Sequence, residues 1–139
     1  MAYDYVEIVQ FMLDHGFNDV GGACSTAASY GSMSTLQLFH SLHLEWDTAV
    51  TATAAFEGRL DVLQWLRDHG CPWSESACQS AASNGQLETL QWLRAQGCPW
   101  DEATTTHAMN EEIYLWAKQN GCPIAEGNPR RSQFVVSEW

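Results

Sequence analysis

Basic residues are scarce in this sequence. Lys and Arg together number 6 against 17 Asp and Glu, which gives a formal net charge of −11 at pH 7. A surface with this balance repels phosphate backbones, so nucleic acid is excluded as the main ligand. The charge fits a partner with a basic surface, and it fits a simple contribution to solubility equally well.

Long apolar runs are also missing. Hydrophobic residues make up 45% of the chain, yet no stretch approaches the roughly 20 residues that a membrane-spanning helix needs. Acids appear early in residues 1–7 and no basic segment precedes an apolar one, so we expect no secretory signal. The cysteines are odd in number, five, and none form a CxxC pair. Together these features predict a reduced, cytoplasmic protein without a cofactor.

The sequence does contain an internal repeat of 27 residues. Residues 63–73 read LQWLRDHGCPW and residues 90–100 read LQWLRAQGCPW, so nine of the eleven positions are identical. Weaker copies stand one and two steps earlier, at 36–46 and 9–19, and a later copy at 114–124 follows at an offset of 24. Self-similarity at a fixed period indicates a repeat architecture.

Each repeat predicts two short helices. The inner helix is rich in alanine and covers roughly 48–56 or 75–83. An N-cap oxygen follows each tryptophan at its start, and a glycine ends it; these are Asp47, Ser74 and Asp101, then Gly31, Gly58 and Gly85. The outer helix carries an apolar stripe at helical spacing, formed by Leu60, Leu63 and Leu66 and repeated as Leu87, Leu90 and Leu93.

A helix pair of this size cannot bury its own stripe, so neighbouring pairs must stack to make a shared core. Alanines let the inner helices approach closely while bulkier residues fill the outer side, which predicts a curved array with the inner helices on the concave face. We expect this array over 1–125, with about four and a half helix pairs, and a tail or cap over 126–139. The three residues lost before 114–124 fall in the connection between the last two helices.

The unit A-A-x-x-G-x-L-x-x-L-x-x-L-x-x-x-G-C, which begins at Ala81, resembles the ankyrin repeat. The recurrent GCPW resembles more narrowly a divergent ankyrin-like family with that motif at each helix junction. The unit has 27 residues rather than the usual ~33, and the shortfall lies between Trp73 and Ala81. The resemblance therefore implies an all-α, ankyrin-like helical-repeat solenoid with short or absent β-hairpin fingers.

The regular cysteines raise the question of a metal site. Cys71, Cys98 and Cys122 occupy equivalent positions, which stacked helices would place about 10 Å apart. That separation is too large for one zinc ion and for a disulfide. We therefore expect all five cysteines to pack in the core, with no metal site.

Catalytic groups are not indicated either. No serine or cysteine has a base partner fixed by a motif, so the chain is not expected to be an enzyme. The tryptophans at the repeat period, Trp46, Trp73 and Trp100, are interpreted as packing residues. The alternative is a stacking platform for sugars or bases.

Binding residues should vary between repeats while the framework stays fixed. The two positions before each inter-helix glycine behave in this way: Ser29-Tyr30, Phe56-Glu57 and Ser83-Asn84. The resemblance implies that they face the concave surface. Tyr30 and Phe56 are the expected anchors, because aromatic side chains dominate interface energetics, although Phe56 could instead fill a gap in the stack. Glu57, with Glu75 and Glu102, would supply an acidic rim.

These features predict a monomeric protein-interaction module that binds another protein, with a basic surface as one fitting choice, through its concave face. The alternative is an effector or inhibitor that blocks or recruits a host-cell enzyme or modification machine. Both functions would use the same surface, so the sequence does not separate them.

Overall fold

The computed structural model describes residues 20–41 and 46–130. Within these ranges the chain is helical, without a strand, and short connections stand where hairpin fingers would lie. The predicted fold class is thus confirmed. The start of the expected array, residues 1–19, and the tail beyond residue 130 lie outside the described residues. The helices are α2 Val20–Ser29, α3 Met33–Ser41, α4 Thr48–Phe56, α5 Leu60–Asp68, α6 Glu75–Ser83, α7 Leu87–Ala95, α8 Glu102–Thr106 and α9 Glu111–Gln119.

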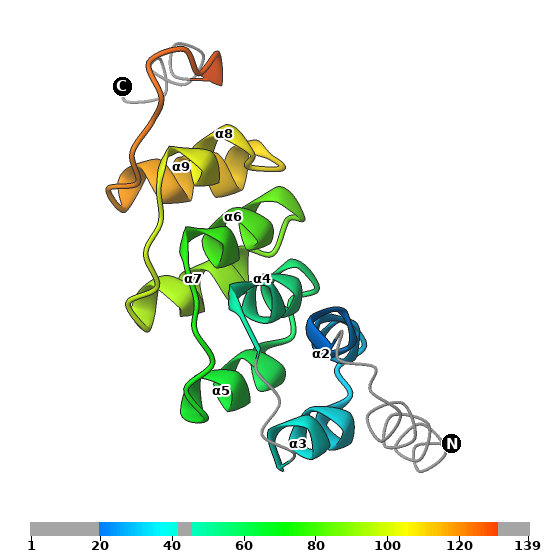
Figure 1. Ribbon diagram of the computed structural model, residues 1–139. Helices are drawn as coiled ribbons and strands as arrows, with labels where there is room; N and C mark the ends of the chain where they lie inside the picture. The colour runs from blue at the N-terminus through cyan, green and yellow to red at the C-terminus, as the bar shows by residue number, and fades with distance from the viewer. Residues whose placement is uncertain (1–19, 42–45, 131–139) are drawn as a thin grey trace.

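The helices form two layers (Figure 1). The inner layer holds α2, α4, α6 and α8, and each of these packs directly on the next one. The outer layer holds α3, α5, α7 and α9, and no pairing of comparable closeness links these helices to one another. Because the inner layer is the tighter of the two, the stack curves toward it (Figure 1).

Side-chain caps begin the inner helices where the sequence predicts them. Asp47 accepts a hydrogen bond from the Ala49 amide at 3.0 Å, and Asp101 accepts one from the Ala103 amide at 3.0 Å. Ser74 accepts the equivalent bond from the Ser76 amide at 3.3 Å. Each cap satisfies a backbone donor that has no partner within the helix.

The glycines that end the inner helices serve conformation and packing together. Gly58 has a φ of 69°, which a side chain disfavours. A Cβ built there would lie 2.5 Å from Gln86 Oε1 of the next unit. The turn therefore requires glycine, and the flexible Gln86 side chain of the next unit occupies the space that a Cβ would take.

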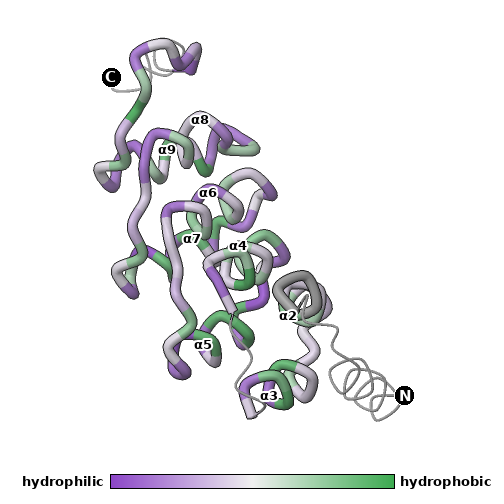
Figure 2. Tube along the Cα trace, in the orientation of Figure 1, coloured by the Kyte–Doolittle hydropathy of each residue, from purple (hydrophilic) through white to green (hydrophobic). Residues whose placement is uncertain are grey.

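The core lies between the layers and runs through the whole stack. Leu63, Leu66, Leu90 and Leu93 of the predicted stripe are fully buried, whereas the first leucine of each stripe is only partly buried. The stripe is wider than the sequence predicts, because the residue before the second leucine, Val62 in α5, is buried too. Apolar segments recur in every unit along the chain (Figure 2).

The last pair is shorter than the others. The sequence places the three missing residues in the connection before α9, but the structure takes them from the inner helix instead: α8 has 5 residues, whereas α6 has 9. The Met109 amide then donates to the Ala82 carbonyl of the preceding unit at 2.9 Å. The Met109 side chain stays 61% exposed.

Candidate functional site

The cysteines belong to the framework. All five are buried and unpaired. The thiols of the repeated GCPW motif donate to backbone carbonyls of the preceding N-cap residues: Cys71 to Asp47 at 3.8 Å, Cys98 to Ser74 at 3.6 Å and Cys122 to Asp101 at 3.4 Å. Burial raises the pKa of Cys24 and of Cys122 to about 11. In the part of the chain that the structure describes, no group of three or more His, Cys, Asp and Glu could hold a metal ion.

The arginines of the repeat stack on tryptophan. The Arg67 guanidinium carbon lies 3.8 Å from the centroid of the Trp73 ring, and that of Arg94 lies 4.2 Å from the centroid of the Trp100 ring. In the preceding unit His40 stacks on Trp46 in the same way, with ring centroids 5.4 Å apart. All three tryptophans are partly buried against the core, which favours the packing interpretation of this column.

Side chains also cap the C-terminal carbonyls of the inner helices from the following unit. Arg59 Nε donates to the Ser29 carbonyl at 3.3 Å. The Phe56 carbonyl accepts from Asn84 Nδ2 at 2.7 Å and from Gln86 Nε2 at 3.3 Å. These bonds fix the register between units along the edge of the stack that carries the variable positions.

The expected anchors are exposed at this edge. Tyr30 is 77% exposed and Phe56 is 42% exposed, and Glu57 is exposed beside Phe56. Ser83 and Asn84 are half-buried, and both already make hydrogen bonds within the chain, since the Ser83 hydroxyl donates to the Ser80 carbonyl at 3.0 Å. These last two side chains are therefore less available to a ligand than the sequence indicates.

The proposed acidic rim is divided between two edges. Glu75 and Glu102 are exposed in the first turns of α6 and α8, whereas Glu57 is the C-cap of α4. A nine-residue helix is about 13 Å long, so the structure does not bring these three carboxylates together. Glu75 and Glu102 lie at the edge opposite to Tyr30 and Phe56.

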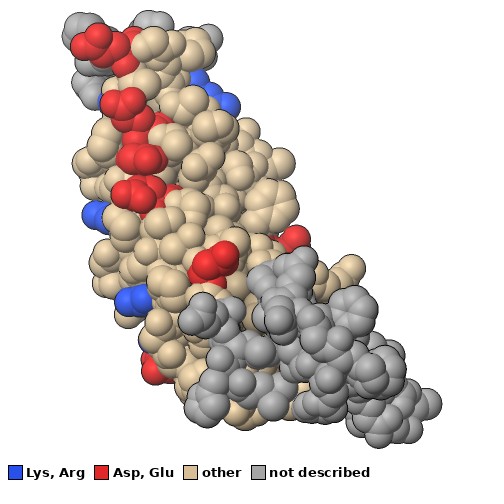
Figure 3. Space-filling model, in the orientation of Figure 1, with Lys and Arg blue, Asp and Glu red and all other residues tan. Residues whose placement is uncertain are grey.

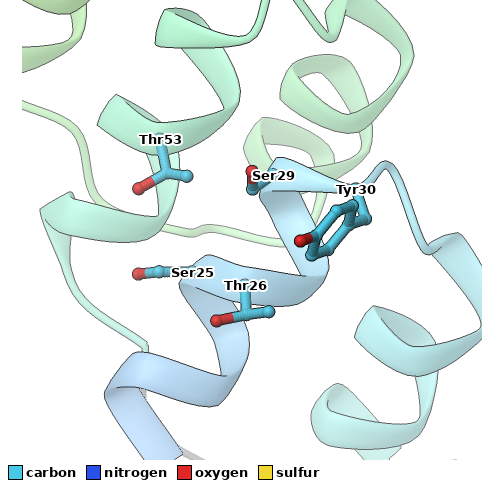
Figure 4. A pocket seen from close by; sticks show the side chains of 5 residues that line it. All are labelled: Ser25, Thr26, Ser29, Tyr30 and Thr53. Carbon is cyan, nitrogen blue, oxygen red and sulfur yellow. The ribbon is translucent and has the colours of Figure 1, made fainter.

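A shallow depression lies between α2 and α4 (Figure 4). Its volume is about 260 Å³, and its lining consists of Ser25, Thr26, Ser29, Tyr30 and Thr53. Every lining side chain carries a hydroxyl group and none is charged. Sequence reasoning found Ser29 and Tyr30 but missed the other three. The available signal was helical spacing, because Ser25 and Thr26 stand four residues before Ser29 and Tyr30 and share their face of the helix.

The acidic side chains and the arginines of this molecule differ in their surroundings. Every Asp and Glu in the described ranges is exposed. By contrast, the arginines at 59, 67, 94 and 130 all donate to backbone carbonyls of the same chain. Acidic side chains gather in a column over one side of the stack (Figure 3). The carboxylates are thus presented to solvent while the guanidinium groups serve the framework.

Comparison with known proteins supports the repeat assignment. The family model of ankyrin repeats (many copies) matches residues 52–94, which cover most of α4, all of α5 and α6, and most of α7. No curated protein and no solved structure matches the chain. None of the described helices is long and apolar enough to cross a membrane. The matched residues and the stacked helix pairs together support an ankyrin-like repeat fold over this part of the chain.

Proposed function

We propose that this protein binds a partner protein through the concave side of its inner layer. Ankyrin repeats generally mediate interactions between proteins. The observation that carries the proposal is the exposure of Tyr30, 77% accessible, beside a hydroxyl-lined depression on two packed helices. Large aromatic side chains that are exposed at the surface often act as the anchors of protein interfaces.

The partner surface should be basic. The exposed carboxylates and the net charge of −11 attract a cationic surface and speed its association at low salt. Because the inner helices are already packed and capped, little chain ordering would oppose binding.

Binding rather than catalysis is supported by the chemistry of the nucleophiles. The thiols are buried, and the raised pKa of Cys24 and Cys122 keeps those two protonated, whereas a nucleophilic cysteine needs an accessible thiolate. Five unpaired cysteines also suit a reducing compartment such as the cytoplasm.

Partner capture from a lysate, followed by mass spectrometry, tests this function. Replacing Tyr30, Phe56 and Glu57 together by alanine should abolish capture of the partner that the natural chain enriches, while the helical circular-dichroism signal stays unchanged. A matched control replaces three exposed outer-helix residues, Asp61, Gln64 and Glu88, and should capture normally. Equal capture by both triple variants would contradict the proposal. An enzyme inhibited upon capture would identify the chain as an effector or inhibitor.

A further inference from the structure

We propose that the depression between α2 and α4 receives an arginine side chain of the partner. This proposal rests on the proposed function, because it assigns a ligand chemistry to one part of the same face. The volume of the depression, about 260 Å³, is below the range of ~300–1,000 Å³ that is usual for small-molecule sites. One long side chain is an appropriate occupant for a hollow of this size.

The lining offers neutral oxygen atoms to a donor. Thr53 Oγ1 already donates to the Ala49 carbonyl at 2.8 Å, so toward a ligand it can only accept. In Figure 4 the Thr53 side chain points from α4 toward α2, where Ser25 and Ser29 lie. Hydroxyl groups keep two acceptor lone pairs each, and a guanidinium carries five donors and no acceptor.

The molecule itself shows how it holds a guanidinium group. Arg67 rests on the Trp73 ring and donates to the Cys71 carbonyl at 3.0 Å. Arg94 repeats the arrangement with the Trp100 ring and the Cys98 carbonyl. An aromatic face combined with neutral oxygen atoms is therefore the arginine site of this repeat. Tyr30 beside the hydroxyl groups presents the same combination at the surface.

The formal net charge of −11 favours a cationic occupant over a neutral one. Glu57 occupies, in the unit of α4, the position that Tyr30 occupies in the unit of α2, so about one helix spacing of 8–10 Å separates them. Arg59 is the opposing charge to consider: its Nε donates to the Ser29 carbonyl, but its side chain is not part of the lining. Removing Arg59 therefore gives opposite results for a cationic and an anionic ligand.

The test uses the full chain, labelled with ¹⁵N, and two short peptides. One is acetyl-Ala-Ala-Arg-Ala-Ala-amide, and the other carries citrulline, the neutral isostere of arginine, at its centre. The arginine peptide should shift backbone amides of α2 and α4 around the depression. The citrulline peptide should bind about tenfold or more weakly, because it lacks the charge that strengthens these hydrogen bonds. Tyr30→Ala should weaken arginine binding similarly and leave the fold intact, since the ring is largely exposed.

Arg59→Gln tests whether the depression prefers a cationic or an anionic ligand. Glutamine can keep the bond to the preceding carbonyl, as Gln86 does in the next unit. Loss of this positive charge near the depression should tighten arginine binding about twofold to threefold. Weaker binding in this variant, equal binding of the two peptides, or shifts confined to the edge of Glu75 and Glu102 would each overturn the proposal.

The two proposals fail in different ways. If partner capture depends on Tyr30, Phe56 and Glu57 but neither peptide shifts the depression, the arginine site is wrong and the proposed function stands. If the arginine peptide binds as expected while capture is unaffected by the triple substitution, the arginine site stands and the proposed function is wrong.

Discussion

The GCPW segment brings a cysteine, a tryptophan and an arginine of the preceding outer helix together at one turn of the backbone. Its cysteine is buried and donates inward, to a carbonyl of the preceding unit. Its tryptophan is partly buried and forms the platform on which the arginine six residues earlier rests. The guanidinium also donates to the carbonyl of the cysteine itself. One short motif thus joins the end of an outer helix to the next inner helix.

Arg94→Ala should lower the free energy of unfolding by about 1–2 kcal/mol, from the lost contact with Trp100 and the lost hydrogen bond to the Cys98 carbonyl. Urea denaturation followed by tryptophan fluorescence measures this change. The stability of Arg94→Lys should lie between that of the natural chain and that of Arg94→Ala, since lysine keeps the charge but not the planar group. If Arg94→Ala is as stable as the natural chain, the contact between Arg94 and Trp100 does not contribute to stability.

The buried thiols should make stability fall at alkaline pH. For Cys24 and Cys122 the folded-state pKa of about 11 exceeds the ordinary value of 9.0, so the unfolded chain loses these protons first. Stability from this source is complete below pH 9 and is lost as pH rises from 9 to 11, by up to ~1.4 kcal/mol per pH unit for each thiol. Urea titrations across that range would show the slope, and Cys122→Ala should reduce it; an identical slope in the variant would contradict the assignment.

The role of Arg67 and Arg94 was not predictable from the sequence. The repeat places them at equivalent positions of neighbouring outer helices but assigns them no contact. The structure instead pairs each arginine with the tryptophan six residues later. That contact depends on the direction in which the chain leaves the outer helix, which residue spacing alone does not specify.

At the scale of the element, local signals decide the helix boundaries. The sequence predicts inner helices over 48–56 and 75–83, and α4 and α6 have these bounds. Caps and glycines act within a few residues, so they can be recognised without knowledge of the fold. The shortened α8 was only half predicted: the sequence shows that three residues are missing but assigns the loss to the connection, whereas the structure takes it from the helix.

The N-caps allow a matched test. Ser74→Ala should destabilise the protein by about 1 kcal/mol, because the Ser76 amide loses its side-chain acceptor. Ser74→Asp should retain the stability, since aspartate caps α4 and α8 in the same way. Thermal unfolding by circular dichroism compares the two variants. Equal melting temperatures for the alanine and aspartate variants would contradict a capping role for this residue.

At the scale of the whole molecule, each unit completes the one before it. The start of the tail continues this rule, because the Arg130 guanidinium donates to the Ala108 carbonyl and Asn128 Oδ1 accepts from the Arg130 amide at 2.9 Å. The side chain of Asn128 is buried. Arg130 therefore contacts the last helix pair, and we propose that the tail caps this end of the stack.

The candidate site was only partly accessible to sequence reasoning. Comparing repeats identifies Tyr30 and Phe56 because they depart from a fixed pattern, and both are exposed. Thr53 and Ser25 could not be paired in advance, since they meet only across the contact between α2 and α4. The hydrogen bonds that engage Ser83 and Asn84 also depend on the placement of neighbouring side chains.

Hydrogen exchange in Leu90→Ala tests whether neighbouring units stabilise one another through a shared core. Leu90 is fully buried in α7, and the truncation should cost about 2–5 kcal/mol. We expect faster amide exchange in α4 and α6 as well as in α7, because neighbouring pairs share one core. Faster exchange confined to α7, with α4 and α6 protected as before, would contradict this expectation.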